Sequence, residues 1–329
     1  MTWLFIFIFS CLLLFWSGSK LVGALMKIAR FLGWREFVVA FFIMAFAGSL
    51  PNLFVGINSA LYKIPQLSFG DIVGGNMVDL TLAIALVVLI GGTNLPARSK
   101  MVQTSTIFTA LIAILPLVLI FDGSLGRVDA LVLILVFLLY IFWIFSRKER
   151  FKKVYNTNRE VKKKYIGLKG FLKNLGRIII YLIFLLLASE GIVRSAGVFA
   201  DALNVTIPLV GILIIGIGNA LPETYFAVIS ARKKQTGMIL GDLMGSIIVC
   251  STLILGIVAL ISPIEISDFS PFAIGRIFLI ISALFFFVAV KTDRKITKKE
   301  GLFLLVIYLL FVLTELYFKN IFLGGLISF

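Results

Sequence analysis

Two carboxylates, Asp79 and Glu223, stand inside long apolar stretches where a bilayer supplies neither water nor counter-ions. Glu223 directly follows Pro222, and Asp79 lies eight residues beyond Asp71, which is roughly 12 Å along a helix. A charge at membrane depth costs at least about 2.5 kcal/mol, so each carboxylate should meet a cation, a proton or a hydrogen-bond donor. Oxygen ligands suit hard cations such as Na⁺ and Ca²⁺, which makes Asp79 and Glu223 candidate metal ligands. The alternative for Asp79 is a protonated packing residue that bonds a buried amide.

The sequence around these carboxylates occurs twice. The stretch from Leu50 to Leu82 recurs without a gap from Leu221 to Leu253, at a constant offset of 171 residues, and Pro51 matches Pro222. A proline removes an N–H donor and frees the carbonyl oxygen four residues earlier, so we expect a helix break at each of the two. Ordinary kinks are the alternative. A duplicated hydrophobic pair interrupted by Gly and Pro is typical of the midplane substrate site of a transporter.

Asp71 and Asp242 occupy matched positions in the two copies. Each is expected near the start of a helix, where exposed N–H groups and the helix dipole favour a carboxylate, so capping is one interpretation. The other is a vestibule through which ions approach the site. The small residues that follow, Gly74-Gly75 and Gly245-Ser246, allow neighbouring helices to approach closely.

The elements that must position these residues are membrane-spanning helices. The chain has 329 residues, of which 60% are hydrophobic, and its apolar runs reach the length of about 20 residues that a bilayer requires. We expect ten spans, near 3–25, 36–62, 67–92, 102–121, 127–146, 177–199, 205–231, 238–262, 271–290 and 300–318. The fold class predicted is therefore an all-α polytopic membrane protein.

The basic residues predict the orientation. The chain has 31 Lys and Arg against 16 Asp and Glu, and most of these cations fall in the loops after spans 1, 3, 5, 7 and 9. By the positive-inside rule these loops face the cytoplasm and both termini lie outside, which explains the net charge of +15 without a nucleic-acid partner. Residues 1–146 form a first five-helix repeat, 147–176 a basic cytoplasmic linker, and 177–329 a second repeat inserted in the opposite sense.

The basic residues between Arg147 and Arg177 suggest contact with anionic lipid headgroups, at about 1 kcal/mol for each cation near the surface. The alternative is an orientation signal and solvated connector. The chain has no histidine, so imidazole ligands and histidine proton relays are excluded. Its two cysteines, Cys11 and Cys250, both fall within spans and indicate no disulfide framework. Nothing in the sequence indicates an oligomeric state.

The segments 218–223 (Gly-Asn-Ala-Leu-Pro-Glu) and 48–52 (Gly-Ser-Leu-Pro-Asn), with the Gly-Asp-x-x-Gly runs at 70–74 and 241–245, resemble the two α-repeats of the calcium/cation antiporter superfamily, the sodium/calcium exchangers. The resemblance implies two inverted five-helix repeats around a diamond of cation sites. The four central positions carried over are Asn52, Asp79, Glu223 and Cys250, with Gly48, Ser49, Gly75, Asn219, Ala220 and Ser246 beside them. Asn52 stands where Glu is usual, and Cys250 stands where Asp or Asn is usual.

The activity that this resemblance implies is secondary active antiport in the cell membrane. Ca²⁺ or a related divalent cation would be exported in exchange for Na⁺ or H⁺ by alternating access of the two repeats. The sequence contains no nucleotide-binding loop or covalent-chemistry motif, so we expect neither an enzyme nor a cofactor, and the energy must come from an ion gradient. Two alternatives remain: a monovalent cation/H⁺ antiporter, and a non-transporting scaffold or sensor with a degenerate site.

Overall fold

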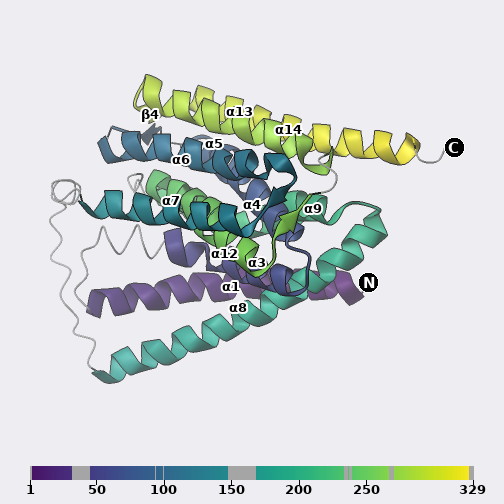
Figure 1. The fold of residues 1–329 in the computed structure, drawn as a ribbon. Coiled ribbons are helices and arrows are strands. Elements are labelled where there is room, and N and C mark those ends of the chain that lie inside the picture. Colours follow the sequence, from purple (N-terminus) through teal and green to yellow (C-terminus); the bar gives the residue numbers. More distant parts are fainter. Residues whose placement is uncertain are drawn as a thin grey trace.

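The computed structural model describes residues 2–31, 45–92, 94–98, 100–146, 168–232, 236, 239–266 and 270–325. These residues form a bundle of long helices whose axes run in broadly similar directions (Figure 1). In the first half the elements are α1 (Thr2–Phe31), α3 (Leu50–Leu61), α4 (Gln66–Val78), the π-helical η2 (Asp79–Ala83), α5 (Ile84–Ile90), β1 (Leu95–Pro96), α6 (Lys100–Leu119), the 3₁₀ turn η3 (Ile120–Asp122), β2 (Ser124–Leu125) and α7 (Arg127–Ser146).

The second half repeats this order. Its elements are α8 (Leu168–Leu203), α9 (Ile207–Val210), the π-helical η5 (Gly211–Ile215), α10 (Gly216–Arg232), α11 (Ile239–Ile248), the π-helical η7 (Val249–Ile254), α12 (Leu255–Ile261), β3 (Ile264–Glu265), α13 (Ser270–Thr292), β4 (Lys295–Ile296) and α14 (Lys298–Gly325). Among the described residues, nine helical runs are long and apolar enough to cross a membrane. The expected span 36–62 falls partly outside the described residues, and its described part includes α3.

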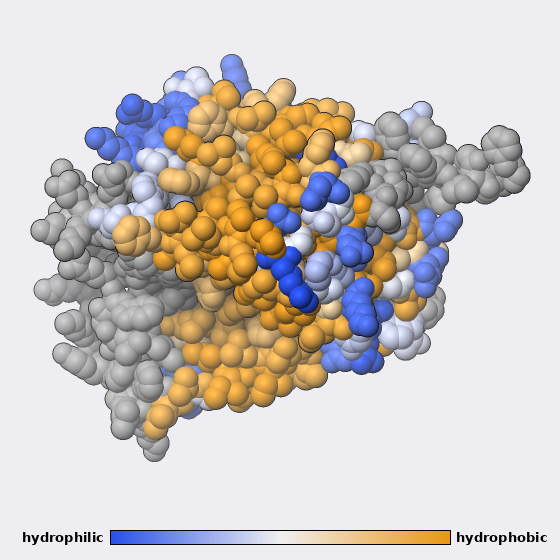
Figure 2. Space-filling model, in the orientation of Figure 1, coloured by the Kyte–Doolittle hydropathy of each residue, from blue (hydrophilic) through white to orange (hydrophobic). Residues whose placement is uncertain are grey.

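The surface agrees with a membrane environment. Large apolar side chains are exposed along the outer helices, for example Leu131, Leu135 and Phe142 on α7. In Figure 2 these apolar residues form a broad area across the middle of the visible face, with hydrophilic residues gathered toward its ends. The expectation of an all-α polytopic membrane protein is therefore confirmed.

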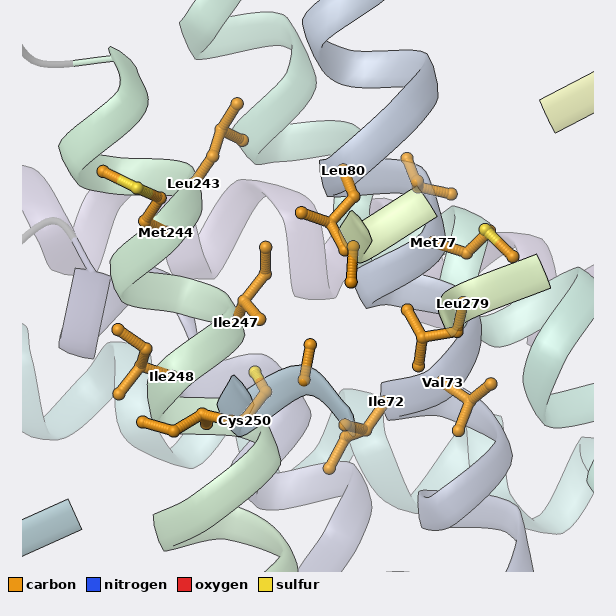
Figure 3. Close-up of a cluster of buried hydrophobic side chains, with 14 of the residues drawn as sticks. Ile72, Val73, Met77, Leu80, Leu243, Met244, Ile247, Ile248, Cys250 and Leu279 are labelled. Atoms are coloured by element: carbon orange, nitrogen blue, oxygen red, sulfur yellow. The ribbon is translucent and has the colours of Figure 1, made fainter. Parts of the chain in front are cut away.

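The two spans that carry the repeated motif occupy the centre of the bundle. In the run Gln66–Ile90, 83% of the hydrophobic window is buried, and in Ile239–Ile261 the value is 78%, against 28–50% for the other spans. Apolar side chains from both runs fill the space between them (Figure 3). The labelled residues are Ile72, Val73, Met77 and Leu80 on one run, Leu243, Met244, Ile247, Ile248 and Cys250 on the other, and Leu279.

Two short antiparallel strand pairs join the loops of the two halves. β1 pairs with β4, so the loop after the expected third span lies beside the loop after the ninth. β2 pairs with β3 and joins the loops after the fourth and eighth spans in the same way. Loops that the expected topology assigns to one membrane face are thus joined to each other.

Three expectations about helix boundaries need correction. Pro51 does lie at the beginning of α3, but α10 continues through Pro222, because a proline removes only one backbone hydrogen bond and the helix resumes beyond it. Asp71 lies inside α4, which begins at Gln66, so it does not cap that helix. α8 begins at Leu168, so the last residues assigned to the linker 147–176 are helical. Residues 147–167 lie outside the described part of the chain.

Glycine contacts hold α4 against η5 and α9. A Cβ atom added at Gly74 would lie 2.1 Å from the carbonyl oxygen of Ile212, and one added at Gly70 would lie 2.4 Å from that of Pro208. From the other side, a Cβ atom at Gly216 would lie 2.8 Å from the backbone nitrogen of Gly75. The two backbones are therefore in direct contact, which only glycine permits at these positions.

We expect Gly74→Ala to destabilise the protein, because its methyl group meets rigid backbone and overpacking of this kind costs about 1–3 kcal/mol. The matched control is Gly197→Ala in α8, where an added Cβ has nothing within 4 Å. Thermal unfolding of the purified protein in detergent should show a midpoint several degrees lower for Gly74→Ala and an unchanged or higher one for Gly197→Ala. Equal midpoints for Gly74→Ala and wild type would contradict the close contact.

Candidate cation site

A small cavity at the centre of the bundle brings together residues from both repeats. Its lining consists of Asn52, Ile72, Gly75, Asn76, Asp79, Asn219, Ala220, Glu223, Ser246 and Cys250. The open space in it is about 10 Å³, which corresponds to one water molecule. All four positions of the expected diamond face this cavity, so the structure gathers residues that are far apart in the sequence.

Asp79 and Glu223 come from different repeats and meet in this cavity. Asp79 is 3% exposed, Glu223 is partly buried, and both side chains line the cavity. The Oδ1 atom of Asp79 has no hydrogen-bond partner. Two ionised carboxylates repel each other strongly in a poorly solvated site, so a proton or a cation must share the space between them. The unbonded oxygen of Asp79 is available as a ligand.

Hydroxyl groups orient Glu223. The Oγ atom of Ser246 donates a hydrogen bond of 2.9 Å to the Oε1 atom of Glu223. Ser49 donates to the carbonyl oxygen of Ala45 at 2.7 Å and lies 3.4 Å from the Oγ atom of Ser246. A Cβ atom added at Gly48 would lie 3.2 Å from Oε1, so the glycine leaves room for the carboxylate. Gly48 and Ser49 thus border the site although they do not line the cavity.

Asp71 is held by an amide from the other repeat. It is fully buried, and the Nδ2 atom of Asn219 donates to both of its carboxylate oxygens at 3.0 Å. Asn219 itself lines the cavity, so Asp71 contacts the site through this side chain. Its matched residue Asp242 lies in the first turn of α11 and is 7% exposed. The duplicated aspartates therefore have different surroundings.

In each repeat the second of the two central residues, Asp79 or Cys250, lies in a π-helical segment. η2 begins at Asp79, and η7 contains Cys250. In both segments a matched threonine, Thr81 or Thr252, donates its hydroxyl to the carbonyl oxygen four residues earlier. Such bulges interrupt the regular helix and are frequent at functional sites. The hydrophobic pattern did not predict them, although Thr81 and Thr252 are identical in the two copies.

Asn76 also faces the cavity and was not among the expected site residues. Its Nδ2 atom donates a 2.7 Å hydrogen bond to the Oγ atom of Ser251. The spacing in the sequence could have predicted the position of Asn76. It lies three residues before Asp79, so both side chains are on the same face of the helix. Away from the cavity, Glu190 and Arg194 form an ion pair of 2.6 Å on α8, and the hydroxyl of Tyr62 bonds both side chains.

The ligand chemistry of the cavity is oxygen-based. In the part of the chain that the structure describes, no cluster of three His, Cys, Asp or Glu side chains has the arrangement of a metal centre. A cation here would therefore depend on the two carboxylates together with hydroxyl, amide and backbone oxygens. Ca²⁺ and Na⁺ accept such mixed oxygen shells. The thiol of Cys250 lies 4.0 Å from the Oγ atom of Ser246, at the edge of this set.

The fold and the site define a membrane protein built from two repeats around a buried carboxylate pair. A family model described as sodium/calcium exchanger protein matches residues 2–146 and 173–317, which is most of the chain. The chain belongs to this family of exchangers, and the expected membership of the calcium/cation antiporter superfamily is confirmed.

Curated relatives cover most of the chain at low identity. The chain is similar to the inner membrane protein YrbG of Escherichia coli, at 25% identity over 83% of this chain and 84% of the relative. It is also similar to the sodium/calcium exchanger MaX1 of Methanosarcina acetivorans, at 22% identity over 92% of this chain and 95% of the relative. Among solved structures, the sodium-calcium exchanger NCX_Mj matches with a TM-score of 0.65 and 23% identity, covering 94% of this chain and 97% of that chain.

We expect Ca²⁺ to raise the thermal stability of the wild-type protein, because a ligand that binds only the folded state stabilises it, by about 2.7 kcal/mol at 100 times its Kd. Glu223→Gln and Asp79→Asn should each remove this stabilisation, since the amide keeps the side-chain volume but loses the charge. Glu190→Gln, in the exposed pair on α8, is the control and should retain it. A Ca²⁺-induced shift that survives in both site variants would place the ion elsewhere.

Proposed function

We propose that the protein is a secondary active antiporter of the cell membrane that exports Ca²⁺ in exchange for Na⁺ or H⁺. The observation that carries this proposal is that Asp79 and Glu223, one from each repeat, line the same small cavity. Family membership and the similarity to the sodium/calcium exchangers MaX1 and NCX_Mj support an exchanger of Na⁺ and Ca²⁺. The N-terminus lies outside and the central loop in the cytoplasm in this proposal.

The charge of the site supports a divalent substrate. Asp79 and Glu223 together carry −2 when both are ionised, and the described residues that line the cavity include no lysine or arginine. One Ca²⁺ neutralises this charge, and so do two Na⁺ or two protons. A third monovalent cation would leave an uncompensated charge, which a poorly solvated cavity disfavours.

Because the two carboxylates come from opposite repeats, movement of one repeat against the other changes their separation. A Ca²⁺ ion that bridges both would hold the repeats together around it, and release would require the pair to separate or to take up other cations. This arrangement is the physical basis of alternating access around a fixed midplane site.

The second candidate is a monovalent cation/H⁺ antiporter. It is favoured by one observation, namely that Asn52 and Cys250 provide no carboxylate at two of the four central positions. Fewer charges weaken the ability of a site to strip water from Ca²⁺, whereas protons and Na⁺ need less compensation. The two candidates share the carboxylate pair and differ in the ion that crosses the membrane.

Purified protein in liposomes should accumulate ⁴⁵Ca²⁺ when a Na⁺ or a proton gradient is imposed across the membrane. Glu223→Gln should reduce this uptake at least tenfold while the folded protein remains in the membrane. Asp201→Asn, an exposed carboxylate near the end of α8, is the matched control and should transport normally. Na⁺/H⁺ exchange without Ca²⁺ uptake would support the second candidate, and the absence of any flux would support a scaffold or sensor.

The charge balance predicts that exchange of one Ca²⁺ for two monovalent cations is electroneutral. Transport in voltage-clamped liposomes should therefore be nearly independent of membrane potential. Asn52→Glu adds about one negative charge beside Glu223 and should make the cycle electrogenic by favouring a third monovalent ion. Because protonation can mask the new charge, the measurement should span several pH values. A wild-type flux that depends strongly on potential would contradict the two-carboxylate account.

A further inference from the structure

A second cavity, remote from the carboxylate pair, opens between α1 and α8. Its volume is about 450 Å³. The α1 side presents Ser19 and Lys20, and the α8 side presents Asn174, Arg177 and Tyr181. Both cations are exposed, and within the described residues neither has an acidic partner within salt-bridge distance. The cavity thus offers two positive charges together with hydroxyl and amide groups, a combination suited to a phosphate group.

The cavity exists because the two helices diverge. Near one end they touch, since a Cβ atom added at Gly191 would lie 2.2 Å from the Oγ atom of Ser10. Toward the other end, added Cβ atoms at Gly23 and Gly176 would meet nothing within 4 Å. Figure 1 shows α1 and α8 separating toward the end where the linker joins α8. A wedge of open space therefore remains between two long helices that otherwise pack together.

The side chains around the cavity favour a lipid over a soluble anion as its ligand. Trp16 lies next to it, in edge-to-face contact with Tyr181 at 5.6 Å between ring centroids, and is 44% exposed. On α8, Leu172, Leu175 and Ile179 flank the polar lining and are 41–57% exposed. The polar lining thus adjoins apolar surface that faces outward. Tryptophan and tyrosine mark the headgroup level of a bilayer, and basic pockets between helices at this level accept anionic headgroups.

We propose that this cavity binds the headgroup of an anionic phospholipid, with its phosphate between Lys20 and Arg177 and its acyl chains along the exposed apolar side chains of α1 and α8. A bound lipid fills the wedge and fixes the separation of the two helices. The position of α1 bears on the cation site, because an added Cβ at Gly18 would lie 3.3 Å from the Cγ atom of Pro51. This inference does not rest on the proposed transport activity.

The test uses the full-length protein with Trp16 as its only tryptophan, the other three being replaced by phenylalanine. The protein is reconstituted in phosphatidylcholine that contains increasing fractions of phosphatidylglycerol with brominated acyl chains, which quench tryptophan fluorescence. Brominated phosphatidylcholine at the same fractions is the reference. We expect saturable excess quenching of Trp16 by the anionic lipid. Equal quenching by the two lipids would overturn the proposal.

The double variant Lys20→Gln/Arg177→Gln should weaken the apparent lipid association roughly tenfold or more. The matched control is Lys298→Gln/Lys299→Gln at the start of α14, which removes the same charge from exposed residues. An equal loss in the control would show general electrostatic attraction and contradict a defined site. Inorganic phosphate added at millimolar concentration should leave the excess quenching unchanged. If phosphate abolishes it, the cavity is a soluble-anion site and the lipid assignment is wrong.

Discussion

Two carboxylates that line one small cavity among buried side chains impose the main constraint on this structure. Asp79 has an oxygen without a hydrogen-bond partner, Glu223 receives one bond from Ser246, and the lining supplies no basic side chain among the described residues. The pair is therefore stable only when protons or cations compensate its charge. A site with this requirement is suited to exchange one kind of cation for another.

The rest of the bundle holds this pair in place through the same devices used in each half. Threonines at matched positions support the π-helical segments that begin at Asp79 and surround Cys250. Glycines bring the backbone of α4 into contact with η5, so that residues of the second repeat reach across to those of the first. The strand pairs β1–β4 and β2–β3 connect the loops at the helix ends. The halves also differ, because Asp71 is held by the amide of Asn219 whereas its matched residue Asp242 lies in the first turn of α11.

Much of this arrangement was predictable because the duplicated sequence keeps its offset of 171 residues without a gap. The long apolar runs predicted the spans, and the carboxylates at membrane depth singled out Asp79 and Glu223. The resemblance to the calcium/cation antiporters added Asn52 and Cys250, and all four residues line one cavity. Local conformation was less predictable. A π-helical turn and an α-helical turn have similar hydrophobic patterns, and Pro222 breaks a helix only if its neighbours cannot continue it. The bond from Asn219 to Asp71 depends on packing between repeats, which periodicity within one helix does not report.

The account rests on a site whose two carboxylates hold either one divalent ion or two monovalent ions. Equilibrium binding of ⁴⁵Ca²⁺ to the purified protein, titrated with Na⁺ at constant ionic strength and pH, measures this directly. The account predicts one Ca²⁺ bound per chain and its displacement by Na⁺ with a Hill coefficient that approaches but does not exceed about two, because the charge available for compensation is −2. Binding of two Ca²⁺ ions per chain, or displacement with a coefficient near three, would contradict it.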